Sequence, residues 1–159
     1  MRYRARIKSL IDNPPTIAKR KGSETEIHAR WAKYACVLIS GFIEQALKEV
    51  VLEYAESKAA PQIRNHIEHT WPKSRNMRSD VIQRTLEGLD KGWSKKHEEW
   101  SNENQRKKEI NEIITWRNDI VHGKESNLNS ITLVSVKDKF KVACDLVDFI
   151  EDLLGVRTK

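Results

Sequence analysis

The chain has 159 residues, of which 33% are charged and 38% hydrophobic, and its formal net charge is +6 at pH 7. This length fits one domain with a core of its own, and the composition excludes a disordered chain. No apolar run approaches the roughly 18 residues of a membrane span, and no apolar signal core follows the basic N-terminus. We therefore expect a cytoplasmic protein, and the positive charge favours an anionic partner such as nucleic acid.

Helical periodicity dominates the first half of the chain. A short helix is predicted over residues 2–11, ending at the turn Asp12-Asn13-Pro14-Pro15, and a third helix begins at Pro61 and ends near Trp71. Between them a long helix is predicted over about 24–57, and its apolar stripe makes it the expected spine of the core. The stripe consists of Trp31, Tyr34, Ala35, Leu38, Ile39, Phe42, Ile43, Ala46, Leu47, Val50 and Tyr54.

The second half continues the helical pattern. Ser79 is expected to cap a short helix, and the mostly charged stretch 93–105 precedes a helix over about 103–122 that ends at Gly123. A last helix begins at Thr132 or Ser135, and the strand-like residues 131–134 are interpreted as a loop because they are solitary. The fold class is therefore all-α, an antiparallel bundle of about five to six helices.

The two cysteines, Cys36 and Cys144, lie far apart in apolar helical patterns. Without CxxC or Cys/His spacing they indicate buried thiols rather than a zinc site or a disulfide scaffold. His66 and His69 are three residues apart, but no third ligand is near them, so they are interpreted as surface histidines. We expect neither a metal nor a cofactor.

Arg117 is anomalous in the helix over 103–122. At about 100° per residue it falls roughly 20° from Ile110, in the middle of a stripe formed by Ile110, Ile113, Ile114, Ile120 and Val121. A buried guanidinium is costly unless it meets a carboxylate, an anion or a polar interface. Glu44 on the long helix is one candidate for a partner that orients Arg117.

Asn118 and His122 are four residues apart and share the flank of that stripe. A guanidinium matches the oxygens of a phosphate, an imidazole transfers protons near neutral pH, and an amide can orient either group. This set favours phosphodiester chemistry in which the 2′-hydroxyl of RNA attacks. Alternatively, Arg117 pairs with an acidic neighbour and His122 merely complements the helix dipole.

The segment WRNDIVHG at residues 116–123 resembles the Arg-Asn-x-x-x-His signature of HEPN domains. The segments SGFIE at 40–44 and DLVDFIEDL at 145–153 are similar to core helices of the RiboL-PSP-type HEPN group. The resemblance covers about residues 29–154. Domain organisation is accordingly expected to be a single HEPN-like helical domain over 1–159, with a core over about 24–154 and residues 1–22 as an N-terminal extension with a short helix.

The resemblance implies a homodimer in which two copies of the motif face a shared cleft. It implies a metal-independent endoribonuclease that leaves a 2′,3′-cyclic phosphate, often as a toxin or phage-defence effector. Arg117 and His122 would be the catalytic pair and Asn118 the supporting polar residue. Any antitoxin or nucleotidyltransferase partner would be a separate protein, and RNA would be the substrate.

Two rival functions remain open. The chain can be a non-catalytic HEPN-type module that binds RNA, a nucleotide or a partner protein, or a helical antitoxin or immunity-type protein. Basic residues that could track an RNA backbone lie before the fourth helix and at the start of the motif helix; they are Lys73, Arg75, Arg78, Arg106 and Lys107. Solvated surface charge is the alternative for all of them.

Overall fold

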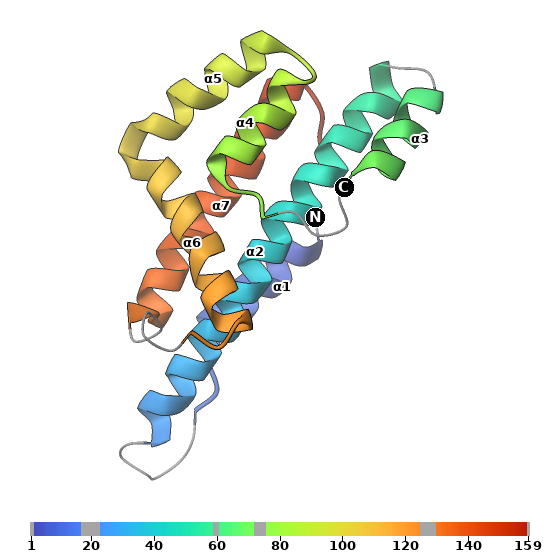
Figure 1. The fold of residues 1–159 in the computed structure, drawn as a ribbon. Helices are drawn as coiled ribbons and strands as arrows, with labels where there is room; N and C mark the ends of the chain where they lie inside the picture. The colour runs from blue at the N-terminus through green and yellow to red at the C-terminus, as the bar shows by residue number, and fades with distance from the viewer. Residues whose placement is uncertain (1, 17–22, 59–60, 72–75, 125–129, 159) are drawn as a thin grey trace.

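The computed structural model describes residues 2–16, 23–58, 61–71, 76–124 and 130–158, and all regular secondary structure in these ranges is helical (Figure 1). The elements are α1 (Arg2–Asp12), α2 (Ser23–Lys58), α3 (Pro61–Thr70), α4 (Ser79–Glu87), α5 (Lys91–Asn102), the 3-10 turn η1 (Glu103–Gln105), α6 (Arg106–Val121) and α7 (Leu133–Leu154). The predicted all-helical fold is confirmed. None of the helices in these ranges combines the length and apolarity needed to cross a membrane.

Helix α2 runs along the length of the molecule, and α1, α3, α6 and α7 pack against it (Figure 1). Its buried positions repeat every three or four residues, which confirms it as the spine of the core. They are Ala32, Ala35, Cys36, Ile39, Phe42, Ile43, Ala46, Leu47, Val50, Val51 and Ala55. The prediction is wrong for Tyr34, which is 45% exposed. Trp31 faces α1 and donates its indole N–H to the Leu10 carbonyl, whereas Tyr34 lies at the rim beside the Trp31 ring.

The motif helix begins later than expected. Asn104 and Gln105 have φ values of +49° and +60°, so the chain turns sharply at η1 and α6 starts at Arg106. Ser79 is not the cap of α4, since Arg78 occupies the N-cap position and the Ser79 N–H donates to Asn111 Oδ1 at 2.9 Å. A side chain of α6 thus replaces the local cap, and this holds the start of α4 against α6.

The N-cap of α7 is the expected residue, but the assignment of the residues that follow it differs from the prediction. Thr132 is the N-cap and forms a capping box with Ser135, in which each hydroxyl oxygen accepts a hydrogen bond from the other residue's backbone N–H. Leu133 and Val134, interpreted as loop, are the first residues of α7, because the cap precedes them. Both cysteines are buried and free, as predicted, and burial raises the pKa of Cys36 to about 12.

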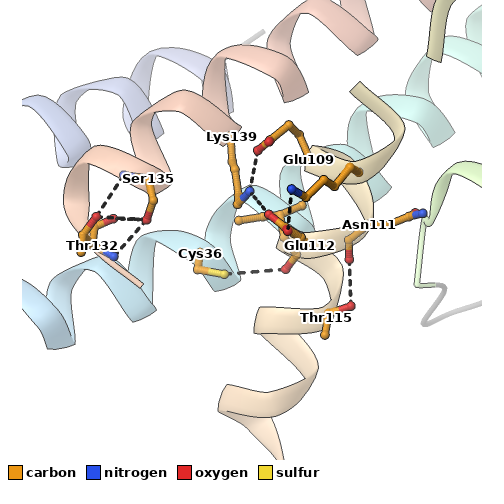
Figure 2. A network of polar contacts seen from close by, with 10 residues as sticks. Cys36, Glu109, Asn111, Glu112, Thr115, Thr132, Ser135 and Lys139 are labelled. Carbon is orange, nitrogen blue, oxygen red and sulfur yellow. Dashed lines mark hydrogen bonds and ion pairs between the residues drawn. The ribbon is translucent and has the colours of Figure 1, made fainter. Parts of the chain in front are cut away.

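A buried ammonium group joins α6 to α7. Lys139 is 4% exposed, and its Nζ lies 2.5 Å from Glu109 Oε2 and 2.6 Å from Glu112 Oε2 (Figure 2). The same Nζ lies 4.5 Å from the centroid of the Trp116 ring. One charge of α7 therefore contacts three residues of α6 that share a face, which fixes the rotation of α6.

His97 of α5 is fully buried, and neither ring nitrogen has a hydrogen-bond partner in the described part of the chain. Its ring stacks on Trp100, with 6.3 Å between the centroids. Burial, with a smaller contribution from the charge of Lys107, lowers the pKa of His97 to about 4. The imidazole is therefore a neutral core group at pH 7.

Acidification is expected to destabilise the protein through His97. Below pH 6.5 the unfolded chain binds a proton at this residue, and the folded chain does so only near pH 4. The free energy of unfolding should fall between these values by up to about 3 kcal/mol. Urea unfolding at pH 7, 5 and 4 should show a smaller decrease in the free energy of unfolding for His97→Phe than for the control His66→Gln, which lies on the exposed surface of α3. Equal pH slopes in the two variants would contradict this assignment.

Removal of the Lys139 charge is expected to destabilise the bundle. Lys139→Met removes the buried cation that Glu109 and Glu112 share and leaves only the exposed Lys108, 4.0 Å from Glu112, which should lower the free energy of unfolding by roughly 2–4 kcal/mol. The matched control is Lys137→Met on the same helix, whose side chain is 66% exposed and which should cost less than about 1 kcal/mol. Denaturant unfolding measures both, and equal losses would show that burial of the cation is unimportant.

Candidate active site

The predicted catalytic residues lie at the C-terminal end of α6. Arg117 and Asn118 are in its last two turns, and His122 follows as its C-cap. Upstream, Ile110, Ile113 and Ile114 are buried, and the Cys36 thiol of α2 donates to the Ile113 carbonyl with Sγ 3.7 Å from the oxygen. This stripe packs α6 onto α2. Its burial is the reason that the chain stays helical up to the motif.

Arg117 continues the isoleucine stripe and is half-buried. Its Nη1 donates to Asn118 Oδ1 at 3.1 Å, so the guanidinium is drawn toward the Asn118 flank of the helix. Val121, one turn further on the same stripe, is 54% exposed. Val121 is thus exposed although it lies on the apolar stripe, whereas the neighbouring Ile120 still packs against the core. The apolar stripe is therefore covered as far as Ile120 and reaches solvent at Val121.

Helix α6 ends at Val121, and His122 is its C-cap. The His122 N–H donates to the Asn118 carbonyl at 3.0 Å, and Gly123 has a φ of +65°. The Gly123 N–H then donates to the Ile120 carbonyl and the Lys124 N–H to the Asp119 carbonyl, which is a Schellman ending. The predicted glycine cap is confirmed, and it leaves the exposed His122 side chain at the helix terminus.

Asp119 is the residue that the sequence interpretation missed. It lies roughly opposite the isoleucine stripe, where periodicity predicts exposure. In the structure it is only 7% exposed, and it has a polar contact within the protein. The acidic side chain of the motif is thus turned inward, and the side chains of Arg117, Asn118 and His122 form the accessible part of the site.

Two basic residues at the start of α6 differ in their surroundings. Arg106 stacks on Trp100, with 4.6 Å from its guanidinium carbon to the ring centroid. Its Nη1 also donates to the Trp100 carbonyl and to Glu103 Oε2, each at 3.1 Å. Lys107 is exposed. Arg106 therefore joins η1 to α5, and Lys107 points to solvent.

The other candidates lie before α4 and on α2. Arg78 is half-buried, and its Nη1 donates to Thr115 Oγ1 on α6 at 3.2 Å. Lys73 and Arg75 lie outside the described residues. Glu44 is half-buried on α2, the helix on which α6 packs, and has a polar contact of its own. Its role in orienting Arg117 stays a prediction.

The chemistry available at this end of α6 is that of a cation, an amide and an imidazole. Arg117 and Asn118 are linked, and His122 lies one turn beyond Asn118 on the same flank. The described residues contain no cluster of three or more histidine, cysteine or acidic side chains able to hold a metal ion. The exposed His66 and His69 lie on α3, apart from this site.

Comparison with protein families identifies one match that spans nearly the whole chain. The family model described as RiboL-PSP-HEPN matches residues 1–155. Comparisons with curated proteins and with solved structures found no match. The match extends the similarity noted for residues 29–154 to include α1.

Gly123→Ala is expected to destabilise the end of α6. An added Cβ would meet no atom within 4 Å, so the cost of about 1 kcal/mol comes from the left-handed backbone alone. The matched control is Gly41→Ala in the middle of α2, where a Cβ also has free space. There alanine should raise the free energy of unfolding by about 0.5–1 kcal/mol. Thermal unfolding measures both, and changes of the same sign would contradict the prediction.

Proposed function

Because the chain belongs to the RiboL-PSP-HEPN family, we propose that it is a metal-independent endoribonuclease that works as a homodimer. Family membership indicates an RNA-related role in general. The proposed catalytic groups are Arg117 and His122, with Asn118 in support. The observation that carries this proposal is the placement of a half-buried arginine, held by an amide, beside an exposed histidine at the end of α6.

Arg117 is suited to bind the phosphate that reacts. Its Nη1 donates a hydrogen bond to the neutral Asn118 amide, which leaves the other N–H donors of the guanidinium for a phosphate. Such a group stabilises the charge that grows on the phosphate oxygens in the transition state. Asn118 then acts as a positioning residue that restrains the long arginine side chain.

His122 supplies the proton transfer. In the proposed reaction an imidazole removes the proton of the ribose 2′-hydroxyl, and the 2′-oxygen forms a bond to phosphorus. The bond from phosphorus to the 5′-oxygen breaks, and a protonated imidazole returns a proton to that oxygen. The products are a 2′,3′-cyclic phosphate and a 5′-hydroxyl, so atoms and protons balance without a metal or a water molecule.

A second copy of the chain completes the proposed site. Arg117 and His122 are five residues apart, about 140° in projection around α6, so one copy surrounds a phosphate poorly. A two-fold axis near the end of α6 would present both groups from two sides of a shared cleft. The exposed Val121 supports this arrangement, because a partner helix would cover the apolar side chain that the bundle leaves uncovered.

The biological role that we propose is that of a toxin or phage-defence effector. A ribonuclease of this kind must be restrained in its own cell, and we propose a separate antitoxin or nucleotidyltransferase partner for that purpose. The net charge of +6 supports RNA as the substrate. The non-catalytic binding module is the alternative that the following experiment distinguishes.

Purified protein incubated with a mixed RNA pool in EDTA should cleave RNA and leave 2′,3′-cyclic phosphate ends. Arg117→Ala and His122→Ala should each lower the rate at least about 100-fold, because each removes a transition-state interaction. The matched controls are Arg30→Ala on α2 and His66→Ala on α3, both exposed residues that should retain activity. A strand with a single 2′-deoxy residue at the cleaved position should stay intact.

Three outcomes would contradict this proposal. Cleavage that EDTA abolishes would indicate a metal-dependent reaction. Cleavage that persists in Arg117→Ala and His122→Ala would indicate another site or a contaminant. Absence of cleavage across transfer, messenger and ribosomal RNA would favour the binding module. Sedimentation of the wild type and both variants should give a dimer in each case, which separates loss of chemistry from loss of assembly.

A further inference from the structure

Five arginines of the described chain are half-buried, and they fall into two groups. Arg4, Arg64 and Arg106 form ion pairs with carboxylates. Arg78 and Arg117 donate instead to neutral groups, a threonine hydroxyl and an asparagine amide, and the described ranges contain no carboxylate paired with either. A partly desolvated cation without a counter-charge is costly, and an external anion offsets that cost.

The backbone of Arg78 is held firmly. Its neighbours Met77 and Ser79 are each 1% exposed, and the Arg78 carbonyl accepts hydrogen bonds from Val81 and Ile82 at the start of α4. The Ser79 N–H is bound by a side chain of α6. The backbone from which the Arg78 side chain extends is therefore fixed by buried structure on both sides, and the hydrogen bond to Thr115 Oγ1 holds the guanidinium.

Arg78 lies over one particular side of α6, which we call the polar face and define by Asn111, Thr115, Asn118 and His122. These residues recur at intervals of three and four, so they line up along the helix. Asn111 and Thr115 are seen on this side in Figure 2, where the Thr115 hydroxyl donates to the Asn111 carbonyl at 2.9 Å. Thr115 thus supports Arg78, and Asn118 supports Arg117.

A phosphate bound by Arg78 would lie beside Thr115, and the phosphate that reacts would lie beside His122, so the spacing of these two residues along the polar face separates the two positions. Thr115 and His122 are seven residues apart, which is about 10 Å along the helix axis. A phosphate bound by Arg78 is therefore not the phosphate on which His122 acts. Two cationic positions along one helix face match the repeated charge of a single RNA strand.

Building on the proposed function, we propose that Arg78 binds a phosphate flanking the cleaved one, so that the RNA strand runs along the polar face of α6 from His122 toward the start of α4. Thr115 is a positioning residue that holds the guanidinium over this face. Arg106 is not part of this proposed RNA-binding path, because its guanidinium stacks on the Trp100 ring and pairs with Glu103. Of the three candidates that lie in the described ranges, Arg78, Arg106 and Lys107, only Arg78 is half-buried without a carboxylate partner.

The test measures binding of a fluorescein-labelled single-stranded RNA oligonucleotide to the His122→Ala protein, which should bind RNA without cleaving it. Adding Arg78→Gln should weaken binding roughly three- to tenfold near physiological salt. It should also reduce the slope of log K against log salt by about 0.7–1, the signature of one lost phosphate contact. The matched control is Arg84→Gln, an exposed arginine of α4 paired with Asp80, which should leave affinity and slope unchanged.

Three further variants keep the proposal testable if Arg78→Gln folds poorly. Arg78→Lys retains the charge and should preserve the salt slope while losing part of the affinity. Thr115→Val removes the hydroxyl that holds Arg78 and should weaken binding less than Arg78→Gln, and Thr115→Ser should restore it. Thermal unfolding should show that any variant used for comparison is folded.

The outcomes separate this inference from the proposed function. Salt slopes and affinities that are equal for Arg78→Gln and Arg84→Gln would overturn the inference, even if the protein cleaves RNA. If RNA binding depends on Arg78 but the wild type never cleaves RNA, the Arg78 phosphate contact would be retained and the proposed ribonuclease activity would be overturned. Failure of the His122→Ala protein to bind RNA, with active wild type, would also overturn the inference.

Discussion

The buried ammonium group of Lys139 is the constraint on which the orientation of the motif helix depends. It meets the carboxylates of Glu109 and Glu112 and the ring of Trp116, which lie on one side of α6 over two turns. A buried charge that loses its partners costs several kcal/mol, so other rotations of α6 against α7 are disfavoured. One side chain of α7 thereby determines which way each residue of α6 points.

The rotation set by Lys139 assigns a different neighbour to each side of α6. The isoleucine stripe packs against α2, where the Cys36 thiol meets the Ile113 carbonyl. The polar face turns to the start of α4, where Asn111 binds the backbone of Ser79. The stripe packs as far as Ile120, and Val121 on the last turn is exposed. Core packing thus positions the end of α6 without enclosing the His122 side chain.

The two arginines without carboxylate partners connect this architecture to the proposed chemistry. Arg117 and Arg78 are each held by a neutral group of α6, so each is oriented without being neutralised. An ion pair would hold either guanidinium more strongly, but it would also compete with a phosphate for the same donors. Neutral support is therefore the arrangement that suits residues whose counter-ion is an external substrate.

The sequence by itself determined most of the helices, the long central spine, the cap at Gly123 and the anomaly at Arg117, because these depend on residues three or four positions apart. It showed only a charged stretch where α5 forms. Only the tertiary structure decided that Val121 is exposed, that Asp119 is buried, and that Asn111 rather than Ser79 serves the start of α4. Those outcomes depend on where neighbouring helices begin and end around α6. A periodic pattern records the side of a helix on which apolar residues gather, but it holds no information on how far along that side another helix reaches.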